Sequence, residues 1–345
     1  MKILISGAAG MVGSHCAEFY AQQGERVWGI DNLMRSRLFK SNKKSVEYNW
    51  EYLTGFKNIE RVYLDIRDIP ALEDVFKKNK FDLIIHTAAQ PGVGFSVQYP
   101  REDFEINAVG TFNMLELASK YSPGASFIYC STNKVYGENV SSYALVEDAT
   151  RYRFKDIIGI GEDTSIDHTT HTPYGVSKYV GDMYVQEYGK TRNIKTAVFR
   201  MSCIYGMRQF GFEDQGWLAW FLIATLMNRK ITIYGDGKQV RDVLYVKDLV
   251  KAFDAFFNSD IESSVFNIGG GVDNTVSLLE YLNMLGDKLN TNIDMDFSDW
   301  RPSDQKVYIS NIEKVKSTLN WAAATSLGEG LDYLISWAKD NRDLF

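Results

Sequence analysis

The sequence has few cysteines, no block of basic residues and no long hydrophobic run, and each absence excludes a class of protein. The cysteines are odd in number and have neither metal nor redox spacing, which fits a reducing cytoplasm and predicts no metal site; they are Cys16, Cys130 and Cys203. The formal net charge is −6 and no basic block is present, so nucleic acid is not expected as a partner. No apolar run approaches the roughly 20 residues of a membrane span. The apolar residues 3–5 are too few for a signal peptide.

What the sequence does contain is an alternation of short apolar runs and longer amphipathic segments. The apolar runs read as strands buried on both faces; they are KILIS, ERVWGID, RVYLD, FDLIIHTAA, ASFIYCS and TAVFRMS. Helix-like segments lie between them, at residues 12–23, 69–79, 104–121 and 174–192. Residues 1–200 therefore predict an α/β fold in which a parallel sheet is doubly wound, with helices on both faces.

The pattern changes after about residue 200, where helix-like stretches are joined by irregular segments rich in glycine, aspartate and arginine. We expect residues 201–345 to form mainly a smaller lobe that completes a cleft. A strand and a helix from about residues 240–268 are expected to return to the first unit. The connections at residues 32–60 and 138–172 exceed normal loop lengths, so each is either functional or holds small elements of its own.

A glycine pattern follows the first predicted strand. In GAAGMVG, Gly7 permits a tight turn, Gly10 lets the backbone approach a pyrophosphate, and Gly13 lets the helix pack on the sheet. The next predicted strand ends at Asp31, where a carboxylate accepts hydrogen bonds from ribose hydroxyls and repels a 2′-phosphate. This favours NAD over NADP as the cofactor, although Arg35 nearby weakens the preference. A solvated turn aspartate is the alternative interpretation of this position.

Three residues predict proton transfer. Tyr174 and Lys178 are spaced i,i+4, so on a helix they share one face. A tyrosine is a poor base at its ordinary pKa near 10, but a neighbouring ammonium favours the phenolate and lowers that pKa. Thr132, in the stretch STNKVYG at the end of a predicted strand, supplies a hydroxyl that can share a proton with the phenolate and a substrate hydroxyl.

Taken together, GAAGMVG, Asp31, STNKVYG and the Tyr174/Lys178 pair resemble the extended short-chain dehydrogenase/reductase family, whose members act on nucleotide-linked sugars. The resemblance covers nearly the whole chain. It implies that Thr132, Tyr174 and Lys178 are catalytic and that Lys178 also holds the nicotinamide ribose. Beyond the residues already named, it implies cofactor contacts from Met11, Val12, Asn32, Asp65, Ile66, Ala88, Ala89, Gln90, Asn107 and Ser131. It also implies a homodimer or homotetramer.

The two residues after Thr132 help to sort the reactions of this family. The family's 4,6-dehydratases have Asp-Glu there, because eliminating water needs an acid and a base. This chain has Asn133 and Lys134, and an amide cannot deliver a proton as an acid. STNKVYG as a unit resembles nucleotide-sugar 2-epimerases that act on CDP-linked deoxysugars and regenerate their NAD. We therefore expect C2 epimerisation through a 2-keto intermediate; a C4-epimerase, a reductase, a dehydratase or a non-catalytic NAD-binding scaffold stay open.

Arginines in the second half are candidates for binding the diphosphate of a nucleotide sugar. Arg208, Arg241 and Arg301 lie in segments marked by glycine or proline, and arginine forks suit diphosphate oxygens. The alternative is three surface ion pairs, for example Arg241 with Asp242. We expect the substrate contacts to come from these arginines together with Thr132 and Asn133.

Overall fold

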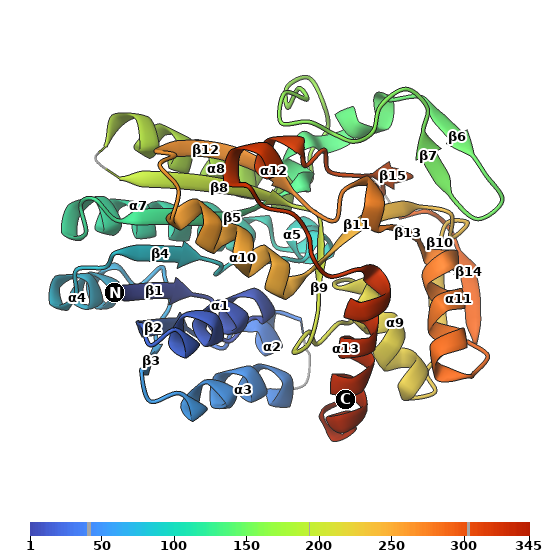
Figure 1. The fold of residues 1–345 in the computed structure, drawn as a ribbon, viewed down its shortest axis with the longest axis horizontal. Helices are drawn as coiled ribbons and strands as arrows, with labels where there is room; N and C mark the ends of the chain where they lie inside the picture. The colour runs from blue at the N-terminus through green and yellow to red at the C-terminus, as the bar shows by residue number, and fades with distance from the viewer. Residues whose placement is uncertain (40–42, 193, 302–303) are drawn as a thin grey trace.

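A seven-stranded parallel sheet forms the centre of the protein (Figure 1). The computed structural model describes residues 1–39, 43–192, 194–301 and 304–345. The strand order is β3-β2-β1-β4-β5-β8-β12, with every neighbouring pair parallel. These strands are β1 Lys2–Ser6, β2 Arg26–Asp31, β3 Ile59–Tyr63, β4 Leu83–His86, β5 Ser126–Thr132, β8 Lys195–Met201 and β12 Ser263–Ile268. The predicted doubly wound α/β fold is confirmed.

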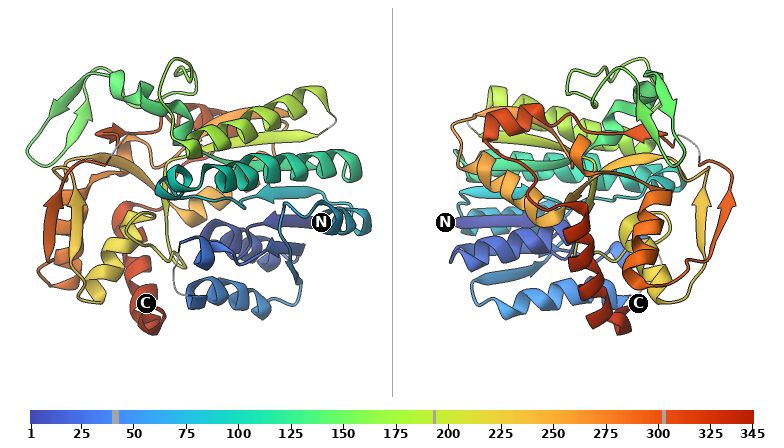
Figure 2. Two further views of the ribbon diagram at one scale, coloured as in Figure 1. Left: turned by 180° about the vertical axis from the view of Figure 1, so that it is seen from behind. Right: turned by 45° about the vertical axis from the view of Figure 1, so that its right-hand side comes forward.

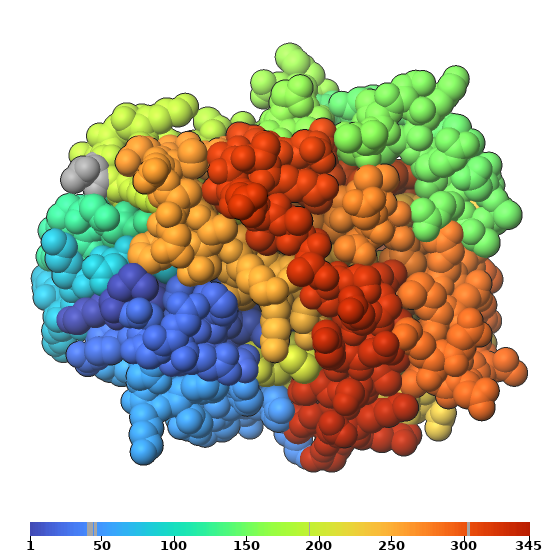
Figure 3. All heavy atoms as spheres, in the orientation of Figure 1, coloured from blue at the N-terminus to red at the C-terminus, as the bar shows by residue number. Residues whose placement is uncertain are grey.

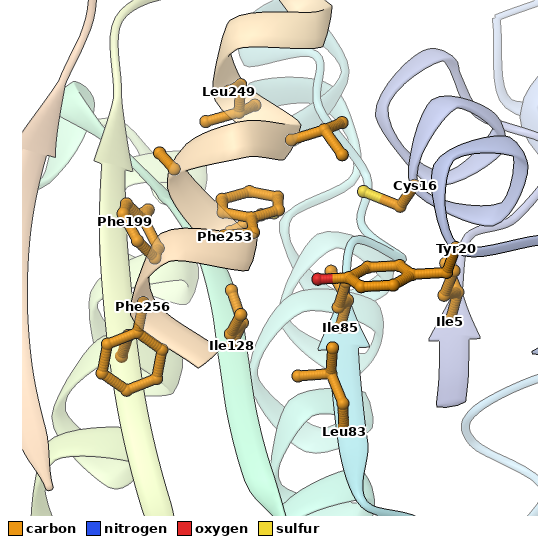
Figure 4. Packing of buried hydrophobic residues seen from close by; sticks show 14 of the residues in the cluster. Ile5, Cys16, Tyr20, Leu83, Ile85, Ile128, Phe199, Leu249, Phe253 and Phe256 are labelled. Atoms are coloured by element: carbon orange, nitrogen blue, oxygen red, sulfur yellow. The ribbon is translucent and has the colours of Figure 1, made fainter. Parts of the chain in front are cut away.

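Helices cover both faces of this sheet. One face carries α1 Met11–Gln22, α10 Val246–Phe257 and α12 Glu313–Leu319, and the other carries α4 Ile69–Lys78, α7 Gly110–Tyr121 and α8 Pro173–Thr191. Figure 4 shows the first face, where Phe253 and Phe256 of α10 and Tyr20 of α1 pack over the central strands. Because side chains alternate along a strand, Leu83 and Ile85 face these helices whereas Ile84 faces the others. Both sets are buried, which explains the continuous apolar runs of the sequence.

The helix predicted over residues 104–121 is interrupted. Helix α6 Pro100–Phe104 continues into a π-helical turn, Glu105–Val109, before α7 begins at Gly110. Such turns recur at functional sites. Helix α8 begins where proline and a hydroxyl indicate it: Pro173 occupies the first turn and Thr172 Oγ1 accepts a hydrogen bond from the amide of Gly175 at 3.2 Å. This start fixes Tyr174 in the first turn.

The second half builds a separate core from three helices and small sheets. The helices are α9 Trp217–Leu226, α11 Leu278–Leu289 and α13 Leu327–Asp340; the strands are β9 Cys203–Tyr205, β10 Ile231–Tyr234, β11 Val240–Tyr245, β13 Thr275–Ser277, β14 Met295–Ser298 and β15 Val307–Tyr308. Strand β11 pairs with β9, β13 and β15, while β10 and β14 form a pair at the outer edge of this lobe (Figure 2, right). Helix α10 and strand β12, although they follow residue 200, pack with the first sheet.

Both long connections hold small elements. Residues 32–60 contain α2 Arg35–Leu38, α3 Lys43–Tyr52 and the turn Leu53–Gly55, and residues 138–172 contain the hairpin β6 Leu145–Glu147 and β7 Tyr152–Phe154. A short helix, α5 Val93–Gln98, follows β4. Figure 3 shows the carboxyl-terminal residues, in red, meeting the amino-terminal half, in blue, where the rings of Tyr48 and Trp337 are 6.1 Å apart. Among the described helices, none is long and apolar enough to cross a membrane.

Candidate active site

A cavity of about 350 Å³ lies at the carboxyl ends of the central strands. In an open parallel α/β sheet this edge is where ligands bind. Most of the sequence-predicted site residues line it: Gly7, Gly10, Met11, Val12, Gly13, Asp31, Asn32, Arg35, Asp65, Ile66, Ala88, Ala89, Ser131, Thr132, Tyr174, Lys178 and Arg208. Gln90, Asn107, Asn133, Arg241 and Arg301 are not among the lining residues.

The glycine-rich loop is too tight for any other residue at two of its positions. Gly7 has φ +75°, and a Cβ there would lie 2.7 Å from the backbone nitrogen of Ala88. A Cβ on Gly13 would lie 2.1 Å from the carbonyl oxygen of Gly7. Helix α1 begins after Gly10 with no side-chain cap and no acidic residue in its first turn. Its amino-terminal N–H groups and positive dipole end therefore face the cavity, the arrangement that binds phosphate groups.

Two carboxylates mark the ends of β2 and β3. Asp31 accepts hydrogen bonds from the amides of Ala9 at 2.9 Å and Leu33 at 2.8 Å, which tie it to the glycine-rich loop. Burial raises the pKa of Asp31, against the effect of these amides. Asp65 accepts hydrogen bonds from Asn32 at 2.8 Å and from Arg67 at 2.7 Å. Burial opposes them, but the Arg67 and Asn32 hydrogen bonds hold the pKa of Asp65 below its ordinary value.

Arg35 turns away from Asp31. Its Nη2 donates to the carbonyl oxygen of Phe210 at 2.8 Å and to Oε1 of Gln215 at 2.9 Å. Burial lowers the pKa of Arg35 to about 10. The guanidinium thus connects the segment after β2 with the second lobe.

Thr132, Tyr174 and Lys178 meet in the cavity, where α8 packs on β5. Burial raises the pKa of Tyr174 to about 12, against a hydrogen bond with Thr132 that lowers it. Burial lowers the pKa of Lys178 to about 8. The Lys178 ammonium lies 4.2 Å from the centre of the Tyr129 ring, and the Tyr129 hydroxyl donates to the backbone oxygen of Lys178 at 3.2 Å. The sequence predicts that a neighbouring ammonium lowers the pKa of Tyr174, but this is wrong for the structure, because burial outweighs the lowering contributions. Two strongly shifted titratable groups in one cavity are still typical of a functional site.

A buried ion pair stabilises the elements that carry this cluster. Asp182, one helical turn after Lys178, accepts hydrogen bonds from Arg200 Nε at 2.9 Å and from Ser131 Oγ at 2.8 Å. The pair is almost wholly buried, at 5% and 0% side-chain exposure. Ser131 therefore lines the cavity while its hydroxyl points to Asp182. This fixes the end of β5 against α8, on which Tyr174 and Lys178 lie.

Gln90 and Asn107 lie behind the cavity wall. Asn107 Oδ1 accepts a hydrogen bond from the amide of Gln90 at 2.8 Å, and its Nδ2 lies 3.0 Å from Oδ1 of Asp103 and 3.1 Å from Oγ of Ser177. Ser177 in turn donates to the carbonyl oxygen of Tyr174 at 3.1 Å. The π-helical turn thus joins the end of β4 to the helix that carries the tyrosine. The sequence gives no signal for Asp103 or Ser177.

Each of the three arginines of the second half pairs with a different carboxylate. Arg208 pairs with Glu18 at 2.6 Å, Arg241 with Asp304 at 2.7 Å and Arg301 with Asp214 at 3.1 Å. Asp242, the alternative partner considered for Arg241, is instead fully buried and hydrogen bonded to Ser202.

Lys134 lies near Arg241. Burial, followed by the charge of Arg241, lowers the pKa of Lys134 to about 8. The two positions after Thr132 carry no carboxylate: Thr132 Oγ1 lies 3.3 Å from Oδ1 of Asn133, and the next side chain is an ammonium.

Several lining residues carry no sequence signal because distant segments bring them to the cavity. They are Asn49 from α3, Met201 at the end of β8, Ser202 after it, Ile204 from β9, and Gln209, Phe210 and Gln215 from the loop that follows β9.

The lining suits a dinucleotide. The start of helix α1, which has no side-chain cap, faces the cavity. A Cβ at Gly7 or Gly13 would lie too close to neighbouring backbone atoms, and Asp31 lies at the end of β2. These are the features that hold a pyrophosphate and a ribose in such folds. Tyr174 and Lys178, on α8, line the same cavity with Thr132 of β5, a strand three positions from β2 in the sheet.

Comparison with known proteins agrees with this geometry. The family model "NAD dependent epimerase/dehydratase family" matches residues 3–269. The chain is 39% identical to CDP-paratose 2-epimerase of Salmonella typhi, over 98% of this chain and 99% of that protein. The structure of UDP-glucose 4-epimerase with UDP-glucose from Thermotoga maritima superposes with a TM-score of 0.82 at 28% identity, covering 99% and 100% of the two chains.

A further solved structure, UDP-glucuronic acid 4-epimerase from Bacillus cereus with UDP-glucuronic acid and NAD, has a TM-score of 0.78 at 25% identity, with 99% of each chain covered. The family model and these whole-chain similarities agree with a cavity whose lining suits a dinucleotide. The chain belongs to the NAD dependent epimerase/dehydratase family, and its cofactor is NAD.

Proposed function

We propose that this NAD-dependent nucleotide-sugar epimerase inverts C2 of a CDP-linked deoxysugar, interconverting sugars of the CDP-paratose and CDP-tyvelose type. The reaction is a transient oxidation to a 2-keto sugar followed by return of hydride to the other face, with no net redox change. The whole-chain likeness to CDP-paratose 2-epimerase supports this choice of carbon and nucleotide.

The observation that carries the proposal is the lack of an acid pair beside Thr132. Among the described residues that line the cavity, the carboxylates are Asp31 and Asp65, at the ends of β2 and β3. Strand β2 is three positions from β5 in the sheet, roughly 14 Å at the usual strand spacing. Both carboxylates already hold hydrogen bonds there. Eliminating water needs an acid and a base at the sugar, so oxidation and return of hydride fit this cavity better than dehydration.

The residues of the cluster have separate tasks in this reaction. Tyr174 takes the proton of the C2 hydroxyl as a phenolate and later returns it, and Thr132 shares that proton through its hydrogen bond with the phenol. The pKa of Tyr174 is about 12 with Lys178 one turn along the helix, so forming the phenolate needs more stabilisation than this ammonium and the Thr132 hydroxyl give on their own. Lys178 also donates to the nicotinamide ribose. NAD, when bound, supplies the reversible hydride acceptor. The buried Asp182–Arg200 pair keeps this geometry fixed.

Arg241 and Arg301 remain our candidates for the substrate diphosphate, with Asn133 beside the sugar. Each arginine pairs with one aspartate, Asp304 or Asp214, and also donates to a backbone carbonyl, that of Val240 or Glu213. Diphosphate oxygens are better acceptors for a guanidinium fork than a single carboxylate contact, so binding can share or replace these pairs.

C4 epimerisation of a nucleotide sugar is the second candidate, and the likeness to UDP-glucose 4-epimerase favours it. Both reactions use the same hydroxyl, phenol and ammonium, so they differ in how the sugar lies in the cavity. A non-catalytic NAD-binding scaffold has no need for these three groups, all of which line the cavity. If Tyr174→Phe leaves turnover intact, the assignment of this residue as acid and base is wrong.

The test is incubation of the protein with CDP-paratose in deuterated water, followed by NMR of the sugar. We expect both epimers at C2, with no deuterium from solvent at that carbon and no NADH released. Incorporation of deuterium at C2 contradicts hydride return. UDP-glucose is offered in a parallel incubation. Inversion at C4 with C2 unchanged supports the second candidate instead.

We propose further that the protein is a homo-oligomer in the cytoplasm. Apolar side chains of one helical surface are exposed, namely Phe104, Val109, Val176, Met183 and Tyr184, at 39–47%. Helices α7 and α8 lie together there, since the rings of Phe112 and Tyr184 are 5.0 Å apart. A second copy of the chain covers this surface in our proposal; light scattering should give a dimer or tetramer for the wild type and a monomer for Met183→Glu. The three free cysteines suit a reducing compartment.

A further inference from the structure

The loop after β9 crosses the cavity of the cofactor. Arg208, Gln209, Phe210 and Gln215 all line it, although they belong to the half of the chain expected to bind substrate. Phe212 and Gln215 close the loop with reciprocal backbone hydrogen bonds of 3.0 and 2.9 Å. We call residues 208–215 the crossing loop. Arg208 at its start has φ +61°, a left-handed conformation that a residue other than glycine keeps only where its surroundings hold it.

The first attachment of the crossing loop is to helix α1. Arg208 Nη2 lies 2.6 Å from Oε2 of Glu18, and its Nε lies 3.3 Å from Oγ of Ser14. The guanidinium stacks 4.2 Å from the centre of the Tyr52 ring, whose hydroxyl donates to the other oxygen of Glu18 at 2.7 Å. Side-chain exposure is 5% for Arg208 and 14% for Glu18. The Arg208 guanidinium therefore donates to two residues of the helix that opens the cofactor site.

Asn49 of helix α3 joins the same loop to the glycine-rich turn. Its Nδ2 donates to the carbonyl oxygen of Ala9 at 3.0 Å and to that of Arg208 at 3.3 Å. The side chain is 2% exposed, and its Oδ1 is buried without a hydrogen-bond partner in the described structure. One amide thus links GAAGMVG to the start of the crossing loop.

The second attachment is Arg35, at the far end of the crossing loop. Its guanidinium donates to Phe210 and Gln215, at 2.8 and 2.9 Å, and lies 5.6 Å from the centre of the Phe212 ring. The ring of Phe39, from the same segment as Arg35, lies 5.0 Å from that of Phe212. Both Arg35 and Phe39 line the cavity. The segment after β2 and the crossing loop therefore meet across it.

We propose that the crossing loop is a clasp that keeps NAD in its site between turnovers, and that Arg208 is a positioning residue for the cofactor rather than a ligand of the substrate diphosphate. The Arg208–Glu18 pair holds one end of the clasp on α1, and Arg35 holds the other. For NAD to leave, at least one attachment has to open. The inference goes beyond the proposed function and does not depend on which sugar is bound.

Glu18 offers a clean test because it does not line the cavity, so its replacement removes no group from the NAD site. Glu18→Gln keeps the shape of the side chain and removes the charge opposite Arg208. The matched control is Glu280→Gln, since Glu280 is also a glutamate that holds a distant arginine, Arg151, at 2.7 Å, and it lies outside the cavity. Holoprotein loaded with isotope-labelled NAD is mixed with excess unlabelled NAD, and the label that remains bound is followed over time.

We expect Glu18→Gln to exchange NAD at least tenfold faster than the wild type, and Glu280→Gln to stay within twofold of it. Arg208→Ala should exchange faster still, and Arg208→Lys should recover part of the loss. The unfolding temperature of each apoprotein shows whether a variant is folded. Tyr52→Phe, which keeps the ion pair, provides a milder second variant and should fall between the wild type and Glu18→Gln.

Exchange of NAD by Glu18→Gln at or below the wild-type rate overturns the clasp. So does an Arg208→Ala variant that raises KM for CDP-paratose while NAD exchange stays unchanged, because that result assigns Arg208 to the substrate. If the wild type does not turn over CDP-paratose, the proposed function fails, but the NAD exchange rates still decide the clasp.

Discussion

Replacing Gly13 by alanine tests whether the glycine-rich loop is shaped for the cofactor. A Cβ at this position would lie 2.1 Å from the carbonyl oxygen of Gly7, closer than the 3.0 Å that real Cβ atoms keep. Helix α1 or the loop then has to move by at least 0.9 Å, the difference between 3.0 and 2.1 Å. Overpacking of this kind costs about 1–3 kcal/mol. If the bound conformation bears this cost, the Kd for NAD rises by roughly 5- to 150-fold.

Calorimetric titration of the apoprotein with NAD measures this change directly. Gly328→Ala is the control, because nothing lies within 4 Å of a Cβ there and Gly328 is inside helix α13. It should leave the affinity for NAD unchanged and stabilise the helix by up to about 1 kcal/mol. A folded Gly13→Ala variant that binds NAD with wild-type affinity would show that this loop does not need glycine at position 13 to hold the cofactor.

Three further predictions concern the catalytic cluster and its support. Tyr174→Phe should lower kcat by about 10²- to 10⁴-fold, the usual contribution of a positioned acid–base group, while the bound NAD per chain stays that of the wild type; turnover and NAD content check this. Asp182→Asn leaves buried Arg200 without its counter-charge, so urea unfolding should show a loss of about 3–5 kcal/mol, whereas Asp296→Asn, in an exposed pair, should lose no more than about 1 kcal/mol. The pKa of Lys178 is lowered to about 8 in the folded protein, so between pH 8 and about 10.4 the unfolded chain binds more protons and stability rises with pH. Over this pH range, the free energy of unfolding of the wild-type apoprotein should therefore rise by up to about 3 kcal/mol relative to that of Lys178→Met. A difference between the two proteins that does not change with pH contradicts the lowered pKa of Lys178.

The sheet and most of the cavity wall follow from local sequence features. The glycine-rich turn, Asp31 and Thr132 stand directly after apolar strands, and the carboxyl ends of parallel strands meet at one edge. Tyr174 and Lys178 follow from helical spacing on α8. These residues could be placed without knowledge of distant contacts.

Long-range contacts decide what the sequence could not show. Arg208 is 190 residues from Glu18 and Arg35 is 180 from Gln215, so the direction of each guanidinium depends on how the two halves of the chain pack. Asn49 reaches the cavity from a long connection whose composition gives no such signal. The apolar periodicity over residues 104–121 looks like that of one continuous helix, so it does not reveal the π-helical turn at residues 105–109. The division of the chain near residue 200 and the substrate contacts of Arg241 and Arg301 stay predictions.

In the reaction that we propose, hydride leaves C2 of the sugar and returns to the same carbon. The most direct test is turnover of CDP-paratose carrying deuterium at C2, in ordinary water, with NMR and mass spectrometry of the product. We expect CDP-tyvelose that keeps the deuterium at C2. Loss of the label to solvent, or recovery of the label at another carbon, contradicts it.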